Sequence, residues 1–160
     1  MGTLTMLEEP GVVAFKKTYF ATLKNSVGSK LWRNFYMLHE GAYVDVLHDG
    51  NVSCAYYVSS ILYQFRLIAE IHTFVDNTVT DMLRSGWIAD PQPCPGAVIV
   101  WEPKTFATSG ETHKHIGFYL RDNLAVSHSD KYRSPILHPC EQHNGRRIAL
   151  VLWHPALEPD

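Results

Sequence analysis

The amino-acid sequence predicts an α+β domain in which N-terminal helices pack on a mostly antiparallel β-sheet. In the first half of the chain, apolar residues recur at helical spacing. After residue 96 the pattern changes to short segments rich in Val, Ile, Tyr, Phe and Trp, which is typical of strands. Helices followed by a run of strands favour an α+β arrangement. Because the 160 residues are 46% hydrophobic and 19% charged, we expect one globular domain over residues 1–160.

Residues 1–48 are predicted to form an N-terminal helical part. Residues 11–24 carry apolar side chains at roughly helical spacing and predict a helix. Residues 31–38 form an apolar and aromatic patch, which we interpret as a short helix or an irregular segment. Residues 43–47 alternate weakly between polar and apolar and predict a brief strand.

The clearest helix begins at Cys54 and extends to Ile68. Ser53 precedes it as a predicted N-cap, and its apolar residues follow the i, i+3, i+4 rule. A further helix is predicted from Thr73 to Ser85, and Gly86 suits its C-terminal end.

Four later segments predict the strands of the sheet. Their residues are 97–101, 115–120, 124–127 and 147–153. Asp122-Asn123, between the second and third, predicts a short hairpin turn. The second and third strands are therefore expected to be neighbours in the sheet.

Composition and charge exclude several function classes. The formal net charge is −2 with no basic block, so we expect no nucleic-acid partner. No apolar stretch is long enough to span a bilayer. Met1 to Pro10 show no secretory signal, which favours the cytoplasm or export without a signal peptide. Three cysteines do not make a disulfide scaffold, although a Cys94–Cys140 bridge stays open, and we expect no cofactor.

Cys54 and His115 have the order and setting of a thiol–imidazole pair. Cys54 lies at the predicted helix start, where the helix dipole favours the thiolate and backbone amides can bind an oxyanion. His115 begins a predicted strand and is a candidate general base. A third polar group should orient the imidazole, and His128 is the candidate because its strand follows the Asp122-Asn123 turn.

Three motifs in this order resemble those of the NlpC-type superfamily of papain-like cysteine peptidases, which includes the CHAP amidases. The first is the helix start Ser53-Cys54-Ala55-Tyr56. The second is the turn Pro93-Cys94-Pro95-Gly96 leading into a strand. The third and most specific is the strand His115-Ile116-Gly117-Phe118-Tyr119. The resemblance covers about half of the chain and implies a papain-like core over residues 49–155.

The resemblance also implies roles for individual residues. Cys54 would be the nucleophile and His115 the base, in an enzyme that cleaves amide bonds of peptidoglycan stem peptides. The commonest spacing puts the third member at Ser127, but we prefer His128 because serine orients an imidazole weakly. Tyr43 is the nearest candidate for a tyrosine that supports the oxyanion. The family usually has Asp-Cys-Ser-Gly at the helix start, where this chain has Ser53-Cys54-Ala55-Tyr56. The family's Pro-Gly-Asp turn has Ala97 in place of the aspartate here.

Other interpretations of these residues remain open. Tyr56 and Tyr57, next to the nucleophile, are candidates for the wall of a substrate groove, besides helix packing. A zinc site could use His113 and His115, which share one face of a strand, together with His128 or with Cys140 and His143. His72 is expected to be structural. A binding module of the same fold, without catalysis, is a further alternative.

Overall fold

The computed structural model describes residues 11–107, 109–141 and 143–158. The interpretation of Met1 to Pro10 lies outside these residues. The helices are α1 (Phe15–Asn25), α2 (Cys54–Gln64) and α3 (Val75–Arg84), with short 3-10 turns at His143–Gly145 and Pro155–Leu157. The strands are β1 (Tyr36–His39), β2 (Ala42–Asp45), β3 (Ile88–Ala89), β4 (Val98–Thr105), β5 (Thr112–Arg121), β6 (Leu124–Ser129), β7 (Ser134–Pro139) and β8 (Ile148–Trp153). None of the described helices is long and apolar enough to cross a membrane.

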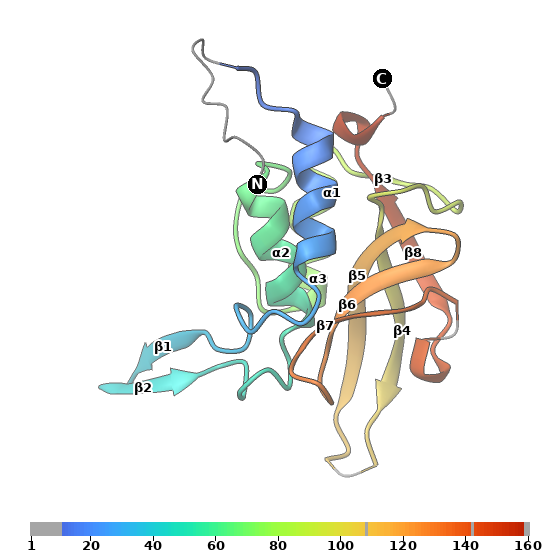
Figure 1. The fold of residues 1–160 in the computed structure, drawn as a ribbon. Helices are drawn as coiled ribbons and strands as arrows, with labels where there is room; N and C mark the ends of the chain where they lie inside the picture. Colours follow the sequence, from blue (N-terminus) through green and yellow to red (C-terminus); the bar gives the residue numbers. More distant parts are fainter. Residues whose placement is uncertain (1–10, 108, 142, 159–160) are drawn as a thin grey trace, which may run out of the picture.

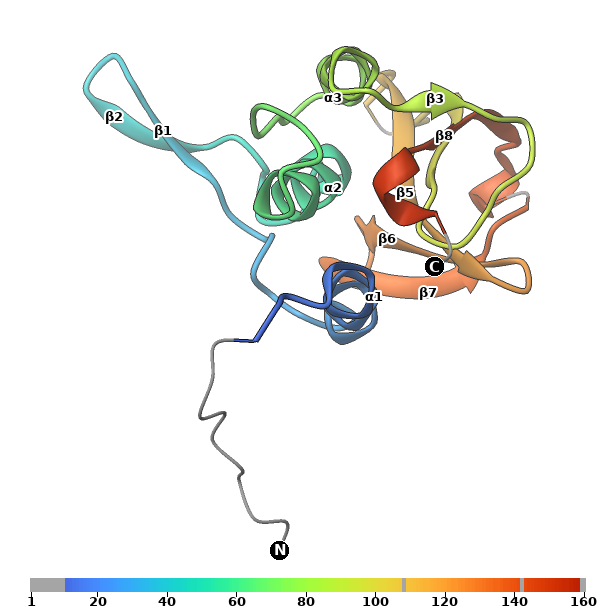
Figure 2. The same ribbon diagram turned by 90° about the horizontal axis from the view of Figure 1, so that it is seen from above.

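Six strands form one antiparallel sheet in the order β3-β8-β4-β5-β6-β7. The three helices lie along one side of this curved sheet (Figures 1 and 2). Helix α2 contacts the central strands β5 and β6, and α3 contacts β5. The predicted α+β class and the antiparallel sheet are therefore confirmed.

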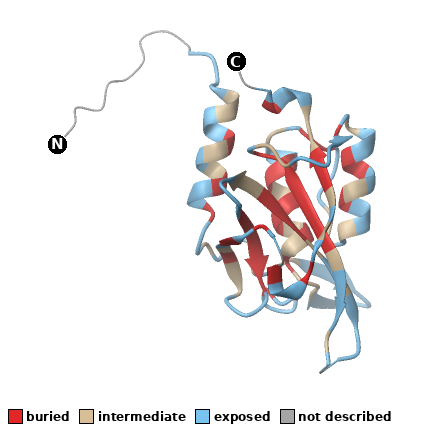
Figure 3. Cartoon of the chain, turned by 90° about the vertical axis from the view of Figure 1, so that its right-hand side faces the viewer, coloured by how far each residue is buried: buried red, intermediate tan, exposed pale blue. Residues whose placement is uncertain are grey.

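Side chains that alternate along the strands build two separate cores, one on each face of the sheet. The helix-side core joins the helices to the sheet and includes Tyr57, Val58, Val98, Ile116, Phe118 and Val126. The far-side core is smaller and consists of Ala97, Ile99, Trp101, Ala125, Cys140 and Val151. Figure 3 shows these buried positions along the sheet and on the inner sides of the helices. A residue on β4, β5 or β6 therefore faces one core or the other according to its position in the alternation.

The predicted helices form, with shifted ends. Helix α1 starts at Phe15 rather than at residue 11, and α2 stops at Gln64 rather than Ile68. Ser53 occupies the N-cap position of α2, but its side chain makes no capping hydrogen bond, so the predicted cap interaction is wrong. Gly86 follows α3 with φ of 95°, as expected for a helix-ending glycine.

Residues 36–45 form a hairpin and residues 31–35 are irregular, so the helix considered for residues 31–38 is wrong. Strands β1 and β2 pair antiparallel through a turn in which Glu40 and Gly41 both have positive φ. The Asp45 carboxylate accepts hydrogen bonds from the backbone N–H groups of Phe35, Leu47 and Asp49 and fixes the base of the hairpin. The hairpin projects away from the sheet (Figures 1 and 2).

All four predicted strands of the main sheet are present, and the turn at Asp122-Asn123 joins β5 to β6 with positive φ at both residues. Two strands of the main sheet were not predicted. Strand β3 has two residues, which is too short to leave a periodic signal. Strand β7 contains Pro135 and Pro139, which argue against a central strand and are tolerated here because β7 is the edge of the sheet.

Candidate active site

Cys54 is the first residue of α2 and packs partly buried against the helix-side core. Burial raises the pKa of its thiol, although hydrogen bonds from the backbone N–H groups of Ile116 and Ala55 act to lower it. Desolvation of the thiol thus opposes the thiolate expected from the helix terminus, and that thiolate stays a prediction. The contact with Ile116 places the sulfur against the residue that follows His115.

His115 lies on β5 opposite Trp101 and shares its face of the sheet, the far side. Its Nε2 atom is 2.7 Å from the Ser127 hydroxyl on the neighbouring strand β6. Gly117 makes this contact sterically feasible, since a Cβ atom there would lie 2.6 Å from the Cβ of Ser127. The glycine of the His-x-Gly motif thus clears the space beside His115.

The polar group hydrogen-bonded to His115 is Ser127, not the predicted His128. Successive residues of a strand point to opposite faces, so His128 lies on the helix side. There the centre of its ring is 6.4 Å from the centre of the Tyr57 ring. Both of its ring nitrogens are buried and have no hydrogen-bond partner in the described structure. Burial and the nearby Arg133 lower the pKa of His128 to about 4, so its ring is neutral at pH 7.

A chain of hydrogen bonds continues from Ser127 to the edge strand. The Ser127 hydroxyl is 2.7 Å from Nε2 of His138 on β7, and Nδ1 of His138 is 2.9 Å from the carbonyl oxygen of Pro139. A carbonyl can only accept, so Nδ1 of His138 donates and, in the neutral ring, its Nε2 accepts from Ser127. Ser127 must then accept from Nε2 of His115. The carbonyl of Pro139 therefore fixes the tautomer of His115, and its Nδ1 carries a free lone pair.

That lone pair belongs to a neutral imidazole. Burial, together with the neighbouring His143 and Arg146, lowers the pKa of His115 well below its ordinary value. Nδ1 of His115 makes no hydrogen bond within the described part of the chain, and none joins it to the Cys54 sulfur. The resting pair is consequently a neutral thiol and a neutral imidazole, not a preformed ion pair. Thiol–base contacts often tighten only when substrate binds.

Trp101 organises the histidines around this relay. Its fully buried ring lies between 5.3 and 5.5 Å from the rings of His115, His138 and His143. Its Nε1 donates to the carbonyl oxygen of Cys140 at 2.8 Å and so holds the segment after β7 against the sheet. The hydrogen bond from Ser127 to His138 was not predicted from the sequence. The excess of histidines in the second half of the chain was the available signal, but only the register of β7 on β6 selects this one.

Arg146 supplies positive charge to the same region. It is 7% exposed, and its Nε and Nη1 atoms are buried without a hydrogen-bond partner among the described residues. Its guanidinium also lies 5.8 Å from the centre of the Phe106 ring. The charge acts to lower the pKa of both Cys54 and His115. A cation placed in this way favours a thiolate and disfavours an imidazolium.

The three tyrosines predicted near the substrate are placed differently. Tyr43 is 81% exposed on the projecting hairpin, and Tyr57 is fully buried with its hydroxyl 2.7 Å from that of Ser26. The buried Tyr57 does not suit the wall of a groove, so that assignment is wrong, whereas the oxyanion role expected for Tyr43 stays a prediction. Tyr56 is partly buried and stacks on Phe35 at 4.9 Å. It is two residues after Cys54 in α2, and its candidate role stays a prediction.

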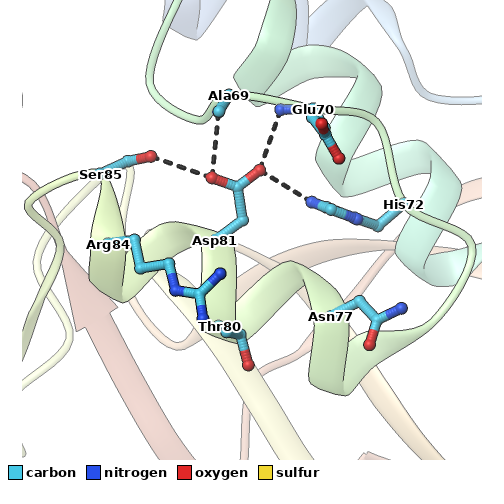
Figure 4. Close-up of a pocket in the computed structure, with 8 residues that line it drawn as sticks. All are labelled: Ala69, Glu70, His72, Asn77, Thr80, Asp81, Arg84 and Ser85. Carbon is cyan, nitrogen blue, oxygen red and sulfur yellow. Dashed lines mark hydrogen bonds and ion pairs between the residues drawn. The ribbon is translucent and has the colours of Figure 1, made fainter.

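A separate pocket lies between α3 and the segment after α2 (Figure 4). At its centre the Asp81 carboxylate accepts from the N–H groups of Ala69 and Glu70, and it also bonds His72 Nε2 and the Ser85 hydroxyl. Burial acts to raise the pKa of Asp81, but these hydrogen bonds outweigh it and lower the pKa. With every partner satisfied, the group ties a loop to α3, and the structural role expected for His72 is confirmed.

The other two cysteines are not paired. Cys94 and Cys140 are both free thiols that border or belong to the far-side core. Burial raises the pKa of each, to about 11 for Cys140.

No protein-family model matches this chain, and no curated protein matches it either.

Proposed function

We propose that this protein is a papain-like thiol hydrolase that cleaves an amide bond through a thioester on Cys54. The observation that carries the proposal is the relay from the Pro139 carbonyl through His138 and Ser127 to His115. It leaves Nδ1 of a neutral imidazole as a base, on the residue next to the Ile116 amide that bonds the thiol. The base and its orienting group are therefore joined by a hydrogen bond, and the nucleophile contacts the backbone beside the base.

Each step can be assigned to a group in this site. His115 Nδ1 takes the Cys54 proton as the sulfur attacks the carbonyl carbon of the substrate. The resulting oxyanion accepts a hydrogen bond from the Cys54 backbone N–H at the start of α2. His115 then gives its proton to the leaving amine, and the thioester remains. Water, deprotonated by the same imidazole, hydrolyses the thioester and releases a carboxylic acid and the free thiol.

The electrostatics favour proton transfer during the reaction over a permanent ion pair. Burial holds the Cys54 pKa high and the His115 pKa low in the resting protein. Arg146 offsets part of the cost of forming the thiolate, because its charge is close to the sulfur and has no hydrogen-bonded counterion on Nε or Nη1. The imidazolium that forms keeps its hydrogen bond to Ser127, since Nε2 donates in either state.

Peptidoglycan stem peptides are the proposed substrate class. This part of the proposal rests on the resemblance of the Cys54 helix and the His115 strand to the NlpC-type superfamily. The same acyl-enzyme would also allow transfer to an amine, which is the less favoured outcome because no acceptor site is defined.

The decisive experiment combines thiol labelling with a peptide-cleavage assay. Purified muropeptides should yield new amino termini with the unaltered protein and none with Cys54→Ala, whereas Cys94→Ala serves as the matched control and should retain activity. Iodoacetamide at near-neutral pH should label Cys54 before Cys94 and Cys140, and labelling should abolish cleavage. Cleavage that persists in Cys54→Ala would refute the proposed nucleophile.

A binding module without catalysis is the second candidate. The raised Cys54 pKa and the missing hydrogen bond between its sulfur and His115 favour it. Absence of cleavage in both the unaltered protein and Cys54→Ala, with equal muropeptide binding by both, would support this function over hydrolysis.

A further inference from the structure

Three histidines meet on the far side of the sheet, next to the catalytic relay. His115, His138 and His143 each offer a ring nitrogen, and these three atoms lie within 4.8 Å of one another. The rings of His138 and His143 are stacked with centroids 3.6 Å apart, and the rings of His115 and His143 are 5.0 Å apart. Two strands and the turn after β7 therefore deliver three imidazoles to one point.

The hydrogen bonds around His138 resemble the supporting shell of a metal ligand. Its Nδ1 donates to the Pro139 carbonyl, which fixes the ring and directs the Nε2 lone pair toward the cluster. The Ser127 hydroxyl lies 2.7 Å from Nε2 of both His115 and His138, so it stands between two of the potential ligands. An ion bound to those two nitrogens must replace this hydroxyl as the bridge.

The predicted zinc ligands are only partly the ones the structure gathers. His113 lies outside the cluster, partly exposed, with its Nε2 3.1 Å from a Glu111 carboxylate oxygen. His128 lies on the opposite face of the sheet, and His138 was not anticipated.

We propose that His115, His138 and His143 form an inhibitory site for zinc or a similar nitrogen-binding transition-metal ion. Three imidazoles without a carboxylate suit zinc, copper or nickel and do not suit magnesium or calcium. Binding closes the site by displacing Ser127 from the His115–Ser127–His138 relay. With the ion on Nε2 of His115, the imidazole proton lies on Nδ1, so His115 has no free lone pair to act as a base. The inhibition rests on the proposed thiol hydrolase, whereas the ion binding does not.

Two features of the cluster limit the affinity and make binding reversible. The stacked rings of His138 and His143 must separate, because imidazoles that share an ion approach it from different directions. Arg146 lies near His115 and His143, and its positive charge opposes that of the ion. Removing this charge should therefore tighten zinc binding, which a purely structural histidine cluster would not show.

Zinc titration against a chromophoric chelator tests the site without any activity measurement. The Cys54→Ala protein should bind one equivalent, because the thiol is not a ligand. His138→Gln and His143→Gln should weaken binding at least about tenfold, His113→Gln should leave it unchanged, and Arg146→Met should strengthen it. Equal affinity in the His138→Gln, His143→Gln and His113→Gln proteins, or loss of binding in Cys54→Ala, would overturn the proposal.

If a histidine variant fails to fold, cobalt substitution of the unaltered protein identifies the ligand atoms instead. The unaltered protein with Co²⁺ should give the visible bands of a nitrogen-ligated ion without a thiolate charge-transfer band, and such a thiolate band would contradict the three-histidine site. In the cleavage assay zinc should inhibit the unaltered protein, and His143→Gln should be less sensitive. Binding without any measurable cleavage would refute the proposed hydrolase and leave the metal site standing.

Discussion

A Cβ atom added to Gly117 would lie 2.6 Å from the Cβ of Ser127 and equally close to the carbonyl oxygen of Val126. The two residues face each other across β5 and β6, on the face that carries His115. Only glycine lets the strands pair normally while the His115 ring reaches the Ser127 hydroxyl. The glycine of the motif is thus a steric requirement of the relay.

Gly117→Ala should disrupt the site and the sheet together. The added methyl group contacts backbone and a Cβ atom, neither of which can rotate away, so we expect a loss of about 1–3 kcal/mol in unfolding free energy. Urea denaturation of both proteins measures this loss of unfolding free energy. Gly28→Ala is the control, because a Cβ there meets nothing within 4 Å and costs only the strain of a φ of 77°. A smaller loss for Gly117→Ala than for Gly28→Ala would contradict the steric argument.

Ser127→Ala and His138→Gln should each lower the rate of amide-bond cleavage. Either change breaks the chain that fixes the His115 tautomer, so each should lower the cleavage rate by on the order of 10²-fold. Because both act through one relay, the double variant should lose little more than either single variant. Losses that multiply in the double variant would mean that the two residues act independently.

The parts of this site that the sequence predicted are those set by local patterns. The helix start at Cys54 and the strand that contains His115 follow from apolar spacing within single segments, although β5 starts at Thr112 rather than at His115. The choice between Ser127 and His128 was not within reach. The turn at Asp122-Asn123 pairs Arg121 with Leu124, and continuing that register would put His128 on the face of His115. A register shift between Tyr119 and Arg121 instead pairs Phe118 with Val126 and brings Ser127 to that face.

The parts that escaped prediction depend on pairing between distant segments. His138 reaches Ser127 only because β7 joins the sheet edge in one register, and its two prolines hide it as a strand. Arg146 has no local signal at all, since its effect comes from burial beside groups far away in the sequence. The raised Cys54 pKa likewise reflects packing against the sheet, which a helix-start pattern does not contain.

Arg146→Met should slow the reaction of Cys54 with iodoacetamide. Loss of the guanidinium removes a charge that lowers the thiol pKa, and each unit of rise reduces the thiolate fraction about tenfold below that pKa. We expect labelling to slow by roughly threefold to tenfold at pH 7. Arg147→Met is the matched control, because the Arg147 side chain is largely exposed and pairs with Glu102. Equal rates in both variants would remove Arg146 from the electrostatics of the thiol.

His128 should make the protein less stable as the pH falls below about 6.5. Burial lowers its pKa to about 4 in the folded chain, against roughly 6.5 when unfolded, so between these values only the unfolded state binds the proton. The folded state therefore loses on the order of 2 kcal/mol between pH 7 and pH 5 through this group. Urea midpoints at the two pH values measure the loss. His128→Gln keeps a polar side chain that does not titrate and should show a smaller decline, while the other buried histidines contribute equally to both proteins. Declines of the same size would show that the buried, unpartnered His128 ring does not control acid stability.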